Sequence, residues 1–89
     1  MRVTQTTITV GNTTTQVLAD NQKRRHLILQ NDSDEVIYVA FGKAAALNAG
    51  IRLAASGGLY EMFGDLVYGH VINAICASGN KKLLVTSGV

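Results

Sequence analysis

Two runs of apolar residues flank a short polar segment in the first half of the chain. Residues 27–29 and 36–41 are rich in β-branched and aromatic side chains, and each run has about the length of a strand. The segment between them, residues 31–35, reads Asn-Asp-Ser-Asp-Glu, a composition that turns favour. This pattern predicts a β-hairpin.

Neither run alternates cleanly between apolar and polar positions. Leu27 and Leu29 share one face of a strand while Ile28 takes the other, and residues 36–41 are apolar on both faces. A strand in a two-layer sheet normally exposes one face to water, so apolar residues on both faces need a second cover. In a chain of 89 residues we expect a second copy to supply that cover, and we expect a homotrimer.

Segments with strand character recur along the rest of the chain, separated by Gly-, Asn- and Ser-containing turns at intervals of about ten residues. These segments are residues 6–10, 13–18, 51–53, 59–63, 71–77 and 82–86, with residues 66–69 as a bridge to the fifth. Residues 43–50 are expected to form a loop with one helical turn, because they are too few for a stable helix. About eight short strands predict an all-β fold, a single small β-sandwich or jelly roll.

A single β domain accounts for residues 1–89, without a linker or an internal repeat. Residues 1–7 are polar and are expected to be an N-terminal arm that is flexible or binds a partner. They lack the apolar core of a signal peptide, which indicates synthesis in the cytoplasm. Proline is absent, so edge strands lack one common protection. Either sheets continue across subunit boundaries, or Thr and Lys side chains guard the edges.

Charged residues make up only 16% of the chain, against about 25% in an average domain, so part of the surface is expected to contact protein. The net charge of +2 is too weak to indicate nucleic acid as the partner. The one basic cluster, Lys23, Arg24 and Arg25, is either an anchor for an acidic protein surface or a solvated strand entrance, and the second interpretation is favoured. No apolar run is long enough to span a membrane.

No group of residues carries an enzyme motif or a metal-ligand pattern. Three acidic residues lie in the polar turn, where turn geometry explains them better than a calcium loop does, and two histidines stand far apart. Three serines lie in Gly-rich turns, and one cysteine lies in an apolar run, where we expect it to be buried and inert. The residues considered are Asp32, Asp34, Glu35, His26, His70, Ser56, Ser78, Ser87 and Cys76. We therefore expect no catalysis, no metal and no cofactor.

Aromatic residues offer one further binding candidate. The tyrosines could form a shelf on which sugar rings stack, or they could anchor an interface. The aromatic residues are Tyr38, Tyr60, Tyr68, Phe41 and Phe63. The favoured alternative places such tyrosines in the core or at its rim, because a tyrosine has an apolar body and a polar tip.

Several strings of the sequence, taken in order, resemble small structural proteins of tailed-bacteriophage particles, the type found as capsid decoration (cement) or as head-fibre and tail-associated subunits. The strings are residues 21–33, 37–42, 50–54, 60–62 and 71–75. The resemblance covers about residues 9–88 and implies a symmetric virion component without a cofactor. The chain departs from the commoner pattern at Leu29, which stands before Gln30 in place of isoleucine.

The expected function is therefore that of a structural virion protein that binds and stabilises the outer surface of a phage capsid. The alternatives are a tail or fibre-base adaptor and a host-surface carbohydrate-binding module. The expected partners are further copies of the chain and the major capsid protein or another virion protein, with no nucleic acid and no membrane. The candidate partner-binding residues are Arg2, Val3, Thr4, Lys23, Arg24 and Arg25.

Overall fold

A computed structural model describes residues 2–64 and 69–89, which contain eight strands and no helix. The strands are β1 (Val3–Val10), β2 (Thr15–Leu18), β3 (His26–Asn31), β4 (Ile37–Phe41), β5 (Ile51–Leu53), β6 (Leu59–Phe63), β7 (Ile72–Ile75) and β8 (Lys81–Gly88). The predicted all-β class is confirmed. The predicted bridge over residues 66–69 lies mostly outside the described residues.

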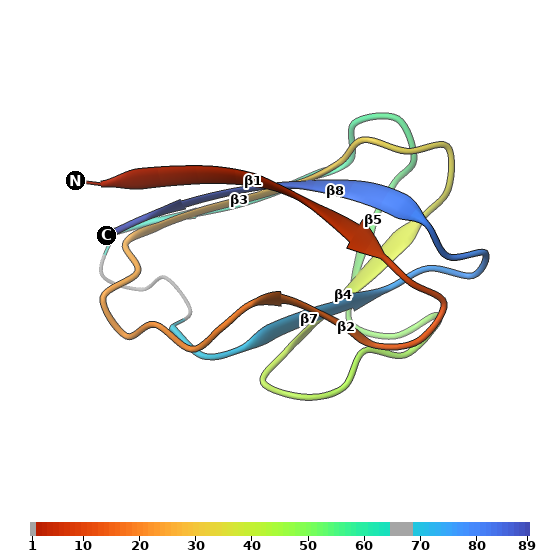
Figure 1. The fold of residues 1–89 in the computed structure, drawn as a ribbon, viewed down its shortest axis with the longest axis horizontal. Coiled ribbons are helices and arrows are strands. Elements are labelled where there is room, and N and C mark those ends of the chain that lie inside the picture. Colours follow the sequence, from red (N-terminus) through yellow and green to blue (C-terminus); the bar gives the residue numbers. More distant parts are fainter. Residues whose placement is uncertain (1, 65–68) are drawn as a thin grey trace.

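The strands form two four-stranded antiparallel sheets, ordered β1-β8-β3-β6 and β2-β7-β4-β5, which pack as two layers (Figure 1). The pairs β1·β8, β2·β7, β3·β6 and β4·β5 make the chain one long hairpin whose midpoint is the β4–β5 turn. Further pairing of β3 with β8 and of β4 with β7 rolls this hairpin into two sheets. The result is a jelly-roll sandwich with both chain ends side by side.

The core lies between the two sheets and is built from alternate residues of each strand. In β3, Leu27 and Leu29 are fully buried while Ile28 between them is only partly buried. Cys76 is also fully buried, as expected, and its thiol donates to the Val10 carbonyl at 3.4 Å. Burying a side chain of the size of leucine contributes about 1.5–3 kcal/mol, so these inward rows stabilise the sandwich.

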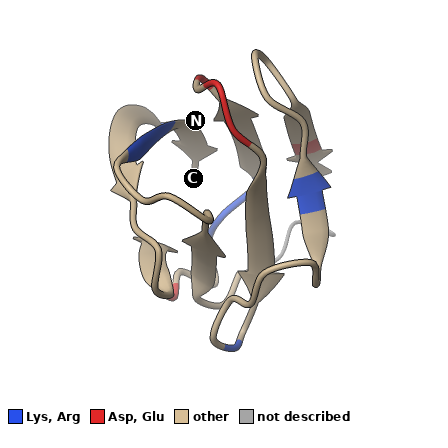
Figure 2. Cartoon of the chain, turned by 90° about the vertical axis from the view of Figure 1, so that its right-hand side faces the viewer, with Lys and Arg blue, Asp and Glu red and all other residues tan. Residues whose placement is uncertain are grey.

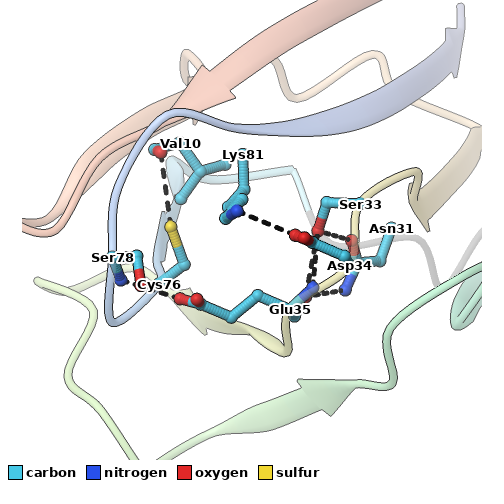
Figure 3. Close-up of polar contacts among 8 residues, drawn as sticks. All are labelled: Val10, Asn31, Ser33, Asp34, Glu35, Cys76, Ser78 and Lys81. Carbon is cyan, nitrogen blue, oxygen red and sulfur yellow. Dashed lines mark hydrogen bonds and ion pairs between the residues drawn. The ribbon is translucent and has the colours of Figure 1, made fainter.

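The predicted hairpin between β3 and β4 is wrong, because the two strands belong to different sheets. The cause is a buried side chain at the end of β3 (Figure 3). Asn31 is fully buried, and its amide nitrogen donates to the carbonyls of Glu35 at 2.7 Å and Leu53 at 3.0 Å. Ser33 donates to the Asn31 side-chain oxygen at 2.6 Å. These bonds turn the chain from one sheet to the other.

The outer face of β4 is covered by this same chain, so it does not require a second copy. Ala40 and the partly buried Tyr38 face outward and pack with Ala45 of the following loop and with Ile75. The loop is held in place by a hydrogen bond from the Ala45 amide to the Thr14 hydroxyl at 2.9 Å. The loop has turns but no helical turn, which corrects that expectation.

Residues 3–7 form the first half of β1, paired with β8, rather than a separate flexible arm. Their side chains nevertheless lie outside the core, since all five are exposed and the core begins only with Ile8 and Val10. This half of β1 is held by its backbone pairing with β8, because backbone bonds need no apolar side chain.

Candidate protein interface

The β1-β8-β3-β6 sheet has one face that points away from the core. Directly opposed residues of antiparallel strands share a face, so the registers define which side chains point away from the core. Besides Gly88, they are Val3, Gln5, Thr7 and Thr9 of β1, Lys82, Leu84 and Thr86 of β8, His26, Ile28 and Gln30 of β3, and Leu59, Glu61 and Phe63 of β6. We call this set the outer face.

The outer face exposes large apolar side chains. Val3 is 51% exposed, Leu59 55% and Phe63 62%, and they are three of the five exposed large apolar residues of the described chain. The Phe63 ring stacks on His26, with ring centres 4.3 Å apart and planes at 21°. Val3 lies on the β1 edge of this face and Leu59 and Phe63 on the β6 edge, with the partly buried Ile28 and Leu84 on the strands between them. Apolar side chains spread over one exposed face are typical of an interaction surface.

Charge on this face is low. Lys82 and Glu61 are its only residues with an ordinary charge at neutral pH, and His26 lies 3.8 Å from the Glu61 carboxylate. Acidic and basic residues are sparse along the strands generally (Figure 2). A surface without a strong charge suits a partner that is also uncharged and that contributes apolar groups and hydrogen bonds.

A shallow hollow of about 380 Å³ lies across β1, β8 and β3 within this face. Its lining includes the apolar side chains of Ile28 and Leu84 between the polar side chains of Gln5, Gln30 and Thr86. None of its lining residues is charged. The hollow can therefore take an apolar group and bind polar groups at its border.

The structure brings the two predicted partner-binding segments together at one end of the sandwich. The Arg2 backbone exchanges hydrogen bonds with Val89 at 2.8 and 2.9 Å, and the Arg25 amide donates to the Gly88 carbonyl at 2.7 Å. Arg2 and Arg25 thus flank the end of β8 from either side. Val3 points to the outer face, Thr4 lies opposite Ser87 in β8 register, and Lys23 is exposed.

Arg24 is buried and binds backbone carbonyls of this chain, which corrects its prediction as a partner-binding residue. Only 4% of Arg24 is exposed, so neither a partner surface nor bulk solvent reaches it. Its guanidinium donates to the carbonyls of Ala19 at 2.8 Å and His70 at 3.2 Å. These bonds tie the β2–β3 loop to the residues before β7. The sequence gives no sign of this, because Arg24 stands between two exposed basic residues.

The tyrosines that can be placed do not form a shelf. Tyr60 faces the core of the sandwich, with its ring centre 5.7 Å from that of Phe41. Tyr38 lies on the outer side of the other sheet and its hydroxyl donates to Asn48 at 3.0 Å. Tyr68 lies outside the described residues. A sugar-stacking surface built on Tyr38 and Tyr60 therefore has no geometry to support it.

The acidic residues of the β3–β4 crossing make local contacts (Figure 3). Asp34 pairs with Lys81 at 2.7 Å, and the Glu35 carboxylate accepts a hydrogen bond from the Ser78 amide at 2.7 Å. These contacts link the crossing to the β7–β8 turn. Within residues 2–64 and 69–89, no group of three or more His, Cys, Asp or Glu side chains is placed to hold a metal ion.

These contacts predict an acid-sensitive part of the stability. The hydrogen bond from Lys81 holds the pKa of Asp34 below its ordinary value of 3.8, and hydrogen bonding to Ser78 holds the pKa of Glu35 below 4.5. A carboxyl with a lowered folded-state pKa stabilises the fold above its unfolded value and loses that contribution as the pH falls through the folded value. The free energy of unfolding should therefore decline as the pH falls below the ordinary pKa values of these two carboxyl groups.

The double variant D34N/E35Q should show a shallower acid decline than the parent chain in chemical denaturation at several pH values. Neither substituted side chain titrates, so the linked protonation disappears. An unchanged slope in the variant would mean that other carboxyl groups carry the acid response.

Sequence reasoning did not assign the two exposed apolar residues of β6 to a partner surface. Leu59 was not a candidate, and Phe63 was considered only among the aromatic residues, although both alternate with Tyr60 and Met62 along the strand. The row with Leu59 and Phe63 contains one polar residue, Glu61, between two large apolar ones, so its outward direction is only weakly marked in the sequence. The pairing of β6 with β3 decides it, because Leu27 and Leu29 fix the inward side.

No helix among the described residues is long and apolar enough to cross a membrane. Comparison with known proteins found no matching family model, no matching curated protein and no matching solved structure. Function must therefore be argued from the residues and the geometry of this chain.

Proposed function

We propose that this chain is a structural subunit of a phage particle and binds the outer surface of the capsid as a decoration protein. The observation that carries the proposal is the outer face, where Val3, Leu59 and Phe63 are exposed on a nearly uncharged sheet. The sequence resemblance to virion structural proteins supports the same assignment. A binding subunit needs a broad stable surface, and the jelly roll provides one.

The mechanism is attachment by burial of the outer face against the shell. The four strands have eight, eight, six and five residues and cover about 430 Å² at the usual strand spacing and rise. A standard specific interface buries about 800 Å² on each partner, so one outer face is a modest contact. Many modest contacts on one shell act together, because each bound copy links neighbouring shell subunits. Binding to the assembled shell then stabilises it by mass action.

The proposal predicts that the exposed apolar side chains of β6 are required for attachment. Phe63→Ser and Leu59→Ser should each weaken binding to capsid shells that lack this protein by about tenfold or more, as expected when a large apolar contact is lost from an interface. Leu47→Ser is the matched control, since Leu47 is 44% exposed but lies in the β4–β5 loop, away from the outer face. Cosedimentation of purified protein with the shells measures the affinity.

Two results would contradict the proposal. If the β6 variants bind as well as the parent chain and Leu47→Ser does not, the binding surface is on the other sheet. If the parent chain does not bind shells, the decoration assignment fails. Binding to isolated tails in the same assay would then support the tail or fibre-base adaptor instead, and binding to host-surface glycans would support the carbohydrate-binding module.

A further inference from the structure

The free edge of β1 differs from the other three sheet edges. β5 has three residues, β2 has four residues and a register shift, and β6 carries Glu61. β1 has eight residues, none of them charged and none of them proline or glycine. Proteins usually protect an edge strand with short length, charge, proline or a bulge, because an open edge pairs with other strands. β1 has none of these protections.

The backbone groups at this free edge follow from the pairing with β8. Arg2 and Val89 donate to each other's carbonyls and so form a hydrogen-bonded pair. Hydrogen-bonded and non-hydrogen-bonded pairs alternate along an antiparallel ladder. Residues 4, 6, 8 and 10 therefore bond to β8, while Val3, Gln5, Thr7 and Thr9 direct their N–H and C=O groups to the free edge.

We propose that β1 pairs with β1 of a second copy, antiparallel, about a twofold axis that passes between the two Thr6 residues. In this register Val3 pairs with Thr9 of the other copy and Gln5 pairs with Thr7. The twofold axis repeats each pair, so every residue of β1 that points to the free edge has a hydrogen-bonding partner. A shift by one pleat repeat in either direction leaves at least one of these residues unpaired within β1. The register is therefore selected by the backbone groups themselves.

The side chains also fit this pairing. Residues 3–7 are exposed on both faces and have no core role, so a second strand can approach without displacing packed side chains. No like charges meet along the contact, because β1 is uncharged throughout. A second copy of this chain is therefore the partner that we propose, since a twofold interface uses the same surface on both subunits.

The paired copies would share one continuous eight-stranded sheet. The twofold axis is perpendicular to that sheet, so both outer faces lie on the same side of it and together cover about 860 Å². This pairing does not depend on the proposed function.

Sedimentation equilibrium of the full chain, over micromolar to high-micromolar concentrations, measures the assembly. The expected mass is twice 9.5 kDa, falling to the monomer mass on dilution. A mass of 9.5 kDa throughout, or a mass three times that value, would overturn the proposal, because twofold pairing of single edges closes at two copies.

Charged variants test the register. Thr6→Lys and Thr6→Glu each place like charges directly opposite one another and should raise the dimer dissociation constant by about fivefold. An equal mixture of the two should regain dimer, because opposite charges then meet at the axis. Thr4→Lys is the matched control, since Thr4 faces the same side and is exposed but lies opposite Ile8 of the other copy. Its dissociation constant should rise less than those of the two Thr6 variants, because no like charge lies opposite it.

A proline variant tests the edge directly. Thr7→Pro removes an N–H that points to the free edge, so it should abolish the dimer and leave the unfolding free energy of the monomer nearly unchanged. A dimer that survives Thr7→Pro and both Thr6 variants would place the contact elsewhere and overturn the proposal.

Discussion

Replacing Asn31 by leucine should lower the free energy of unfolding by about 3 kcal/mol, which is a fall of about 15 °C in Tm for a domain of this size. Asn31 is fully buried, and its amide satisfies the carbonyls of Glu35 and Leu53. Leucine has a similar volume but no donor, so the Leu53 carbonyl loses its side-chain partner and the Glu35 carbonyl keeps only the Ser33 hydroxyl at 3.0 Å. Thermal unfolding followed by circular dichroism measures the change.

Gln30→Leu is the control for this substitution. Gln30 precedes Asn31 in β3 but faces outward, so the same new side chain should change stability by less than about 0.5 kcal/mol. If Asn31→Leu unfolds at the same temperature as the control, the buried amide does not hold the crossing between the sheets, and another feature must keep β3 and β4 apart.

Gly58→Ala should destabilise the fold by about 3 kcal/mol through crowding of the backbone. A Cβ atom at this position would lie 2.3 Å from the Ala54 nitrogen and 2.4 Å from the Ala54 carbonyl oxygen. The Gly58 carbonyl also accepts a hydrogen bond from the backbone N–H of Asn31 at 2.8 Å, so the turn cannot move aside without disturbing β3. Urea denaturation measures the loss as a lower midpoint.

Gly11→Ala is the matched control, because its nearest contact would be the Thr15 hydroxyl at 3.3 Å. That side chain can shift slightly, so the stability cost should stay below about 1 kcal/mol. Equal midpoints for the Gly58 and Gly11 variants would contradict the close approach of Ala54 and Gly58.

Local sequence patterns predicted the strands because alternation and turn residues act over a few positions. The Gly57-Gly58 turn is an example: Gly57 has φ +113°, as expected for a glycine turn. Residues 59–63 were predicted with the bounds that β6 has. The start of β1 was missed because its first residues are held by β8, far away in the sequence.

Strand pairing could not be predicted in the same way, since it depends on contacts between distant residues. The turn at residues 31–35 has the composition of a hairpin turn. Asn31 nevertheless points inward, on the same side of β3 as Leu27 and Leu29, and its side chain donates a hydrogen bond to a carbonyl of β5. One signal was available: an amide on the buried row of a strand must find partners inside the protein. The direction of β6 was hard to predict for the same reason, because Glu61 is the one polar residue beside Leu59 and Phe63, and the pairing with β3 is what places all three outward.

A density map of capsid shells saturated with the purified protein tests the proposed function most directly. We predict density for the sandwich on the outside of the shell, with the β1-β8-β3-β6 sheet facing the shell and Leu59 and Phe63 at the contact. Density in which the β2-β7-β4-β5 sheet faces the shell, or shells that remain bare at saturating protein, would contradict it.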